Sequence, residues 1–281
     1  MKSSCKVISS NNFCFVTLMS LLLLTPWSIA STEQSRLALT TDVTWSSKYM
    51  LDGFKVGGDS PVWQLAGKTD LYASGFSVML WTALQADRSR KQYDEQDFFL
   101  LYSRDFLKDS QNTINLHGFY DYWIFPNTEP LLDDAGQIAS SSKKHGNKFQ
   151  VGITLPHRIP FGGSFLVPSY NIYQWLYWAQ DRADRNQAGA HHEFLLQYDR
   201  ATPLLIPGAT YQYSGGSIST NYNTGAFGVK PGWSHSTASL LSGVYALKSI
   251  FTFSLNYQWT YEETINPGNE FWSTFSYIKK F

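Results

Sequence analysis

Polar side chains, some of them charged, recur at every second position in several segments of this 281-residue chain. In the first such segment Asp42 alternates with apolar residues, Val43 and Trp45 among them. Because successive side chains of a strand point to opposite faces, each segment would carry one polar face. The charged members of these faces are Asp42, Lys48, Lys68, Asp70, His117, Asp121, Lys148, Glu193 and Asp199. Such a face could select polar solutes by charge and size, or form ion pairs that brace a narrow barrel.

Two other groups have residue types suited to catalysis or metal binding. His235 and Ser236 could act as base and nucleophile, but neighbouring strand residues point to opposite faces and no third orienting group is evident. His191, His192 and Glu193 could ligate a metal, yet on a strand the two histidines diverge. We therefore expect no catalytic residue, no metal site and no bound cofactor.

Aromatic residues make up 16% of the chain and gather near the ends of the predicted strands. An amphipathic aromatic side chain suits the two membrane–water interfaces, where membrane barrels carry aromatic girdles. The girdle residues expected on this ground are Trp45, Tyr49, Trp63, Tyr257, Trp259, Tyr261, Trp272 and Tyr277. A sugar-stacking platform is the alternative, and the dense aromatic cluster at 170–178 is the first place to look for it.

The strands that would position these side chains follow from the same period. From Phe251 to Tyr261 every second residue is apolar or aromatic, and hydroxyls and amides fill the alternate places. Only a strand keeps that period. Reading the chain in this way gives about twelve strands, near 36–50, 61–73, 76–86, 97–106, 112–125, 148–155, 165–178, 191–200, 208–215, 233–246, 250–261 and 270–281. Ten or fourteen strands stay possible, because some faces are ambiguous and Pro168 interrupts a ladder.

Long and short connections alternate between these strands. The connections after odd-numbered strands are long and polar, and those after even-numbered strands are mostly short. Outer-membrane barrels have short periplasmic turns and longer outward loops. The sequence therefore predicts an all-β fold, a transmembrane antiparallel up-and-down β-barrel with both chain ends on the periplasmic side. A soluble sandwich or lipocalin-like barrel is the alternative, but it would bury its apolar face and expose its charges.

The first 30 residues have the pattern of a cleaved secretory signal peptide. Lys2 and Lys6 precede an apolar run at 13–24, and small residues follow up to Ala30. A short membrane anchor is the alternative, but the run is shorter than the roughly 20 residues that a spanning helix needs. Export from the cytoplasm is the expectation, with cleavage after Ala30.

Composition limits the partners of the mature chain. Without Lys2 and Lys6 of the signal segment, the mature balance is 20 basic to 22 acidic residues, which argues against the concentrated basic face that a nucleic acid requires. Both cysteines, Cys5 and Cys14, lie in the signal segment. Residues 31–281 are therefore expected to form one outer-membrane barrel domain, held by a closed hydrogen-bonded ladder and not by disulfides.

A set of residues stands out around the first hairpin, in the third strand and in the acidic lead-in to the fourth: Ser47, Tyr49, Gly53, Pro61, Gly75, Phe76, Trp81, Asp94, Glu95 and Asp97. With these residues the first third of the mature chain resembles the opening of the TorF-type outer-membrane porins. The chain has Asp52 where an arginine is expected and Lys279 where an apolar residue is common, so no solute preference is transferred. The resemblance implies a barrel with a channel role and brings no catalytic residue.

The end of the chain also indicates an outer-membrane barrel. A terminal Phe281 on an amphipathic strand resembles the end signature of such barrels, and it predicts recognition by the barrel-assembly machinery. The other expected partners are outer-membrane lipid and small polar solutes, while the oligomeric state stays open.

These features together predict an outer-membrane, porin-like channel for passive diffusion of small polar solutes. One alternative is a non-conducting barrel that acts through its loops as an adhesin, receptor or envelope scaffold. A less favoured alternative is a lipid-acting enzyme that uses His235. The longest loop, 126–147, is expected either to fold inward and narrow the pore or to reach outward to a partner.

Overall fold

The computed structural model describes residues 37–108, 112–127, 131–132, 138–140, 145–178, 189–206, 209–225 and 230–281. The predicted signal peptide, 1–30, lies outside these ranges. Within them, no helix has the length and apolar character needed to cross a membrane.

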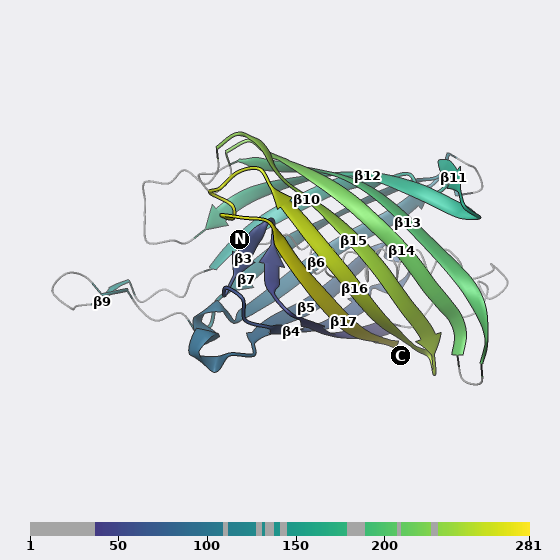
Figure 1. Ribbon diagram of the computed structural model, residues 1–281, viewed down its shortest axis with the longest axis horizontal. Coiled ribbons are helices and arrows are strands. Elements are labelled where there is room, and N and C mark those ends of the chain that lie inside the picture. The colour runs from purple at the N-terminus through teal and green to yellow at the C-terminus, as the bar shows by residue number, and fades with distance from the viewer. Residues whose placement is uncertain are drawn as a thin grey trace.

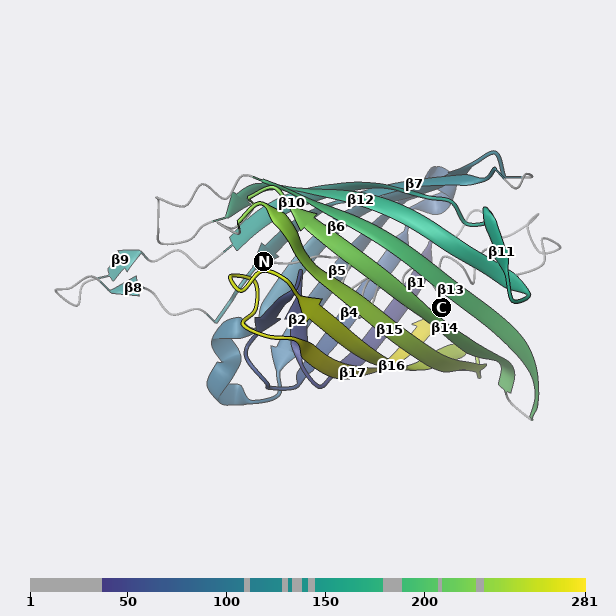
Figure 2. The same ribbon diagram turned by 45° about the horizontal axis from the view of Figure 1, so that its top comes forward.

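Twelve antiparallel strands close into one barrel (Figures 1 and 2). They are β1 (Ala38–Ser46), β4 (Val62–Asp70), β5 (Phe76–Gln85), β6 (Glu95–Phe106), β7 (Ile114–Ile124), β10 (His145–Thr154), β12 (Ser164–Trp178), β13 (Ala190–Ile206), β14 (Ala209–Asn223), β15 (Gly232–Ala246), β16 (Ser249–Thr260) and β17 (Glu270–Lys280). Each pairs with the next along the chain, and the ring closes where β1 pairs with β17, Val43 opposite Tyr277. The prediction of an all-β barrel of about twelve strands is confirmed.

Short elements occupy the connections. β2 (Tyr49–Leu51) and β3 (Phe54–Val56) form a hairpin between β1 and β4, and β8 (Leu131–Leu132) pairs with β9 (Ile138–Ser140) between β7 and β10. β11 (Ile159–Phe161) extends β12, and two 3₁₀ turns, η2 (Tyr72–Ser74) and η3 (Arg88–Tyr93), complete the described elements.

The two faces of the barrel wall differ in polarity. On β16, Phe253 is 45% exposed on the outside, whereas its neighbour Thr252 is 5% exposed on the inside. The same alternation places Leu65, Leu100 and Val151 on the outer surface. Because the period is two, each strand presents one apolar face outward and one largely polar face inward.

Two strands extend further than the sequence pattern indicates. The predicted strands 191–200 and 208–215 correspond to β13 and β14, which run on to Ile206 and Asn223. The added part of β14 is rich in hydroxyls and contains Gly216, so its own strand signal is weak. It is held by pairing on both sides, with β13 and β15.

Pro168 lies within β12 without breaking the barrel. Its carbonyl oxygen accepts a hydrogen bond from the Leu155 amide, 3.0 Å away, just beyond the end of β10. A residue's N–H and C=O point to the same side of a strand. The missing N–H of Pro168 therefore faces the place where β10 has already ended, and pairing with β13 is unaffected.

The two ends of the barrel contain different parts of the chain. The terminal end contains Ala38 and Lys280, where the described barrel begins and ends, and the hairpin end contains β2 and β3 (Figure 1). The β8–β9 pair stands beyond the wall at the hairpin end in both views (Figures 1 and 2).

Candidate functional site

The β2–β3 hairpin is inserted into the barrel at the hairpin end. Tyr49, Met50 and Leu51 are each 2% exposed, although they belong to a connection between barrel strands. The hairpin turns through Asp52 and Gly53, which both have positive φ, 47° and 88°. An Asp-Gly pair favours the tight two-residue turn that such angles require. The connection therefore folds back into the mouth.

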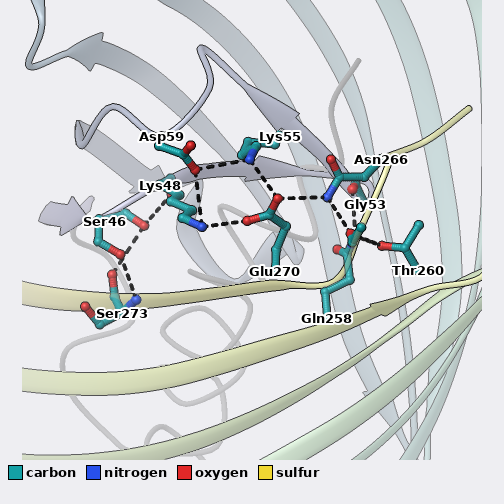
Figure 3. Close-up of polar contacts among 12 residues, drawn as sticks. Ser46, Lys48, Gly53, Lys55, Asp59, Gln258, Thr260, Asn266, Glu270 and Ser273 are labelled. Atoms are coloured by element: carbon teal, nitrogen blue, oxygen red, sulfur yellow. Dashed lines mark hydrogen bonds and ion pairs between the residues drawn. The ribbon is translucent and has the colours of Figure 1, made fainter. Parts of the chain in front are cut away.

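One side of the hairpin is held by a cluster of charges around Glu270 (Figure 3). The Glu270 carboxylate accepts hydrogen bonds from Lys48 Nζ at 2.6 Å and from Lys55 Nζ at 2.8 Å. Asn266 Nδ2 donates to the same carboxylate at 3.2 Å, and Asp59 lies 3.3 Å from Lys48 and 3.1 Å from Lys55. These five residues are called the Glu270 cluster. They join β17 to both arms of the hairpin.

The protonation of the cluster's loop members reflects these contacts. The hydrogen bond to Glu270 raises the pKa of Lys55, against the opposing effect of partial burial. Hydrogen bonds from Lys55 and then Lys48 lower the pKa of Asp59. Both groups are thus held in their charged forms, which favour the docked hairpin.

The tip of the hairpin touches the wall directly. Gln258 Nε2 donates to the carbonyl oxygen of Gly53 at 2.7 Å. A Cβ on Gly53 would lie 2.6 Å from His235 Nδ1 and 2.7 Å from Ile265 Cγ2. Glycine is therefore needed here for both the positive φ and the close approach.

The other side of the hairpin packs on an aromatic part of the inner wall. Tyr49 donates a hydrogen bond to Glu95, and its ring centroid lies 6.1 Å from that of Trp81. Tyr49 and Leu51 share one apolar cluster with wall residues from five strands: Val62, Met79, Trp81, Ala83, Phe99, Leu101, Phe119 and Tyr173. Burial of this apolar surface stabilises the inserted position.

A buried lysine completes the contact between hairpin and wall. Lys148 Nζ lies 3.6 Å from Asp52 Oδ2, and it lies 4.4 Å from the ring centroid of Trp175 and 5.5 Å from that of Tyr173. Lys148 has no exposed surface. Aromatic faces and a carboxylate together offset part of the cost of burying the ammonium group.

Toward the terminal end, the inner wall carries a connected set of polar side chains. Asn115 Nδ2 donates to Asp105 at 2.7 Å, and Asn115 Oδ1 lies 3.1 Å from His117 Nδ1. His117 Nε2 lies 2.8 Å from Asn171 Oδ1, and Asn171 Nδ2 donates to Glu193 at 3.1 Å. This chain of contacts crosses β6, β7, β12 and β13 inside the barrel.

The opposite inner wall is formed mainly by small hydroxyl and amide side chains. The buried members on β1 and β14 to β17 are Thr44, Ser46, Ser219, Asn221, Thr237, Ser239, Thr252, Ser254, Asn256, Gln258, Thr274 and Ser276. They bond to one another across strands, for example Thr44 to Ser276 at 2.6 Å and Ser254 to Thr274 at 2.5 Å. We call this surface the hydroxyl wall.

The predicted lumen residues alternate with outward apolar residues on their strands, with one exception. Lys48 follows the end of β1 and belongs to the Glu270 cluster. Lys68 and Asp70 are brought together at 2.8 Å, and Lys148 stands opposite Asp121 in the ladder. The inner-face set on the strands is Asp42, Lys68, Asp70, His117, Asp121, Lys148, Glu193 and Asp199. Their role in solute passage stays a prediction.

Most of the predicted girdle residues lie on the outer surface. Trp63, Trp259 and Tyr261 are exposed there, and Trp45, Tyr257 and Tyr277 are partly exposed on outward positions. Tyr49 and Trp272 depart from the prediction, since both are buried inside the barrel. Tyr49 belongs to the inserted hairpin and not to β1. Trp272 shares the inward face of Glu270, Thr274 and Ser276, because the spacing is even.

The alternative chemistries find little support in this geometry. His235 is 1% exposed inside the barrel, so it does not face lipid. His191 points inward and contacts Asn221 at 2.7 Å, whereas His192 points outward and contacts Tyr170 at 2.7 Å. Among the described residues, no three His, Cys, Asp or Glu side chains are grouped so that they could hold a metal ion.

The aromatic cluster at 170–178 is divided between two faces. Tyr173 and Trp175 point inward and pack near Lys148, and Tyr170 points outward. Rings on opposite faces cannot stack on one sugar. The three described rings of that segment, Tyr170, Tyr173 and Trp175, therefore form no single platform.

The inserted hairpin is the part of the site that sequence patterns alone do not predict. The available signal is the Asp52-Gly53 pair between two short apolar runs, which indicates a tight hairpin but not its location. Loop 126–147 is expected either to fold inward or to reach outward, and its described pair, β8 and β9, lies outside the barrel (Figure 2). The connection that the structure places in the mouth is the first one, which contains β2 and β3.

Comparison with known proteins gives only distant structural similarities. No family model and no curated protein sequence matches the chain, so the resemblance to TorF-type porins stays a prediction. The KdgM porin has a TM-score of 0.47 at 7% identity, with 86% of this chain and 99% of that chain covered. The COG4313 outer membrane channel from Pseudomonas putida F1 has a TM-score of 0.45 at 11% identity, covering 92% and 100%. LpxR from Salmonella typhimurium has a TM-score of 0.48 at 8% identity, covering 85% and 99%. Scores this low carry no argument about function, which rests on the residues of the barrel itself.

Proposed function

We propose that this protein is an outer-membrane barrel that lets small polar solutes diffuse passively through a narrowed lumen. The observation that carries the proposal is the polarity of the closed wall. Large apolar side chains such as Phe253, Leu240 and Leu80 are exposed on the outside, and polar ones face inward. Hydrocarbon on the outside and water on the inside is the environment that stabilises this arrangement.

The expected signal peptide at 1–30 supports export toward this membrane. The alternation of long and short connections supports a periplasmic location for the terminal end. Phe281, whose amide bonds to the Leu39 carbonyl at 2.8 Å, belongs to the same proposal as the signal for the barrel-assembly machinery. Passive passage does not require the protein to modify the solute chemically.

The inserted hairpin makes the passage narrow at the outer mouth. It packs on the aromatic side of the wall and is tied to Glu270 and Gln258 on β17 and β16. Beyond the hairpin, toward the terminal end, solutes would pass along the hydroxyl wall, whose neutral donors and acceptors replace water contacts without strong binding. We expect a small unitary conductance.

Planar-bilayer recording of the refolded mature protein tests this function. A variant in which residues 49–56 are replaced by a short Gly-Ser linker is recorded beside it, because this segment lies outside the barrel ladder. Small steps in the wild type and larger steps in the variant are expected. Silence in both proteins, with the barrel folded by heat-modifiable gel mobility, would rule out the channel.

A non-conducting barrel is the second candidate, and the density of contacts around the hairpin favours it. Inward side chains at the hairpin end, including Asp121, Lys148 and Trp123, have no exposed surface. Current steps in the hairpin variant only, and none in the wild type, would identify a plugged barrel that acts through its loops.

A further inference from the structure

We propose that the passage is selective for cations over anions of similar size, an inference that rests on the proposed channel function. Carboxylates outnumber ammonium groups on the inner face of the described strands. The inward acids are Asp42, Asp70, Glu95, Asp97, Asp105, Asp121, Glu193, Asp199 and Glu270, and the inward lysines are Lys68, Lys148 and Lys280. Rings of acidic side chains are the usual basis of cation preference in pores.

Two of the three inward lysines are already paired with acids. Lys68 lies 2.8 Å from Asp70, and Lys148 lies 3.6 Å from Asp52. The two lysines of the hairpin are both bound in the Glu270 cluster. A passing anion would therefore find few positive charges free of a carboxylate neighbour in the described lumen.

Three carboxylates toward the terminal end have only neutral hydrogen-bond donors beside them. These terminal carboxylates are Asp42, Asp105 and Asp199. Their partners, at 2.9, 2.7 and 2.7 Å, are the side chains of Thr44, Asn115 and Gln197. Within the described residues, none of the three forms an ion pair with a lysine or arginine. The test below is made at pH 8 so that these carboxyl groups are ionised, and their charge is then solvated by hydrogen bonds and not cancelled by a described basic partner.

The position of the terminal carboxylates lets them act on a passing ion. They lie on β1, β6 and β13, which are separate sectors of the ring, so the ion meets negative charge from more than one side. All three side chains are partly exposed. By contrast, Asp121 and Lys148, which lie nearer the hairpin end, are fully buried. At 0.1 M salt the screening length is about 10 Å, so these charges are felt across a narrow lumen.

Selectivity could instead arise from acids in the loops at the mouth. Asp87, Glu262 and Glu263 are such acids, and they lie in the β5–β6 and β16–β17 connections. They provide a matched control, because neutralising them removes the same number of charges from outside the barrel wall.

The experiment measures the reversal potential of the refolded mature protein in planar bilayers with 1 M KCl against 0.1 M KCl at pH 8. The wild type is compared with Asp42→Asn/Asp105→Asn/Asp199→Asn and with Asp87→Asn/Glu262→Gln/Glu263→Gln. We expect a K⁺ over Cl⁻ permeability ratio of about 5 or more, since a unit charge about 4 Å away in water changes local ion concentration about fivefold. The lumen triple variant should lose most of this ratio, and the loop variant should keep it.

The outcomes separate this inference from the channel function. Current with a ratio near one, or with a preference for Cl⁻, overturns the cation preference and leaves the channel intact. A loop variant that loses the ratio as completely as the lumen variant overturns the assignment to the terminal carboxylates. Absence of current in the wild type and in the hairpin-replaced variant removes the channel, and the selectivity with it.

Discussion

Gln258 donates a 2.7 Å hydrogen bond to the carbonyl oxygen of Gly53, a residue 205 positions earlier in the chain. The bond joins β16 to the tip of the hairpin that follows β1. It identifies the tip as a point where small changes should alter the bore of the barrel without altering its ladder.

Gly53→Ala should displace the hairpin. The added methyl would approach His235 Nδ1 to 2.6 Å at a residue with φ of +88°, a conformation that costs a non-glycine residue about 1 to 3 kcal/mol. We expect a larger unitary conductance and a lower Tm of the hairpin-end structure. Gly268→Ala is the control, since its Cβ would meet nothing within 4 Å. Equal conductance in both variants and wild type would mean that the tip does not set the bore.

Glu270→Gln should loosen the base of the hairpin. The neutral amide keeps the size of Glu270 but removes the negative charge that Lys48 and Lys55 share, and it keeps only one of the two acceptor oxygens. Trypsin should then cleave after Lys48 or Lys55 faster than in the wild type, as followed by mass spectrometry. Glu263→Gln, in a loop outside the Glu270 cluster, is the matched control. Unchanged protection in Glu270→Gln would contradict the anchoring role.

Docking of the hairpin should depend on pH at both extremes. The pKa of Asp59 is lowered from 3.8, so its contribution is present above that value and is lost as pH falls through the still lower folded pKa. The pKa of Lys55 is raised from 10.5, so its contribution is present below that value and is lost as pH rises through the folded pKa. The part of the single-channel conductance that hairpin docking sets should be constant between these limits and should rise outside them.

Two controls sharpen the pH experiment. Lys55→Met should remove the alkaline change, because no ammonium is left to deprotonate. Since Asp59 is 72% exposed, high salt should weaken its contribution. An alkaline rise of the same size in Lys55→Met would assign the change to another group.

Single cysteines in a protein of residues 31–281, which contain no cysteine, should report which face meets water. In vesicles, a charged methanethiosulfonate reagent should modify Asp199→Cys, which is on the inner face of β13, and should not modify Phe194→Cys, which is 45% exposed on the outer face. A reagent that partitions into lipid should reverse the order. Rapid modification of Phe194→Cys by the charged reagent would contradict the membrane environment.

The barrel itself is predicted well from the sequence, because its main determinant is local. Alternation in β16 depends on neighbours such as Phe253 and Ser254, and it is visible in one strand at a time. The end of β14, which the sequence pattern does not predict, shows the limit of predictions from local alternation. Its glycine and hydroxyl residues form a strand only through pairing with β13 and β15.

The inserted hairpin could not be predicted in the same way. Tyr49, Met50 and Leu51 are buried in succession, so they show no alternation. Their burial depends on partners such as Glu95 and Gln258, which are distant in sequence and are brought near only by closure of the ring. Trp272 is a different case, because its even spacing from Thr274 already indicates the inner face.

The anchoring of the hairpin on β16 and β17 has a consequence for the order of biogenesis. Glu270 and Gln258 belong to the last strands to be made, so the seat of the hairpin does not exist while the nascent sheet is still open. The mouth can therefore reach its final width only after β1 has paired with β17 and closed the ring. An arrested intermediate should therefore be leakier than the finished protein.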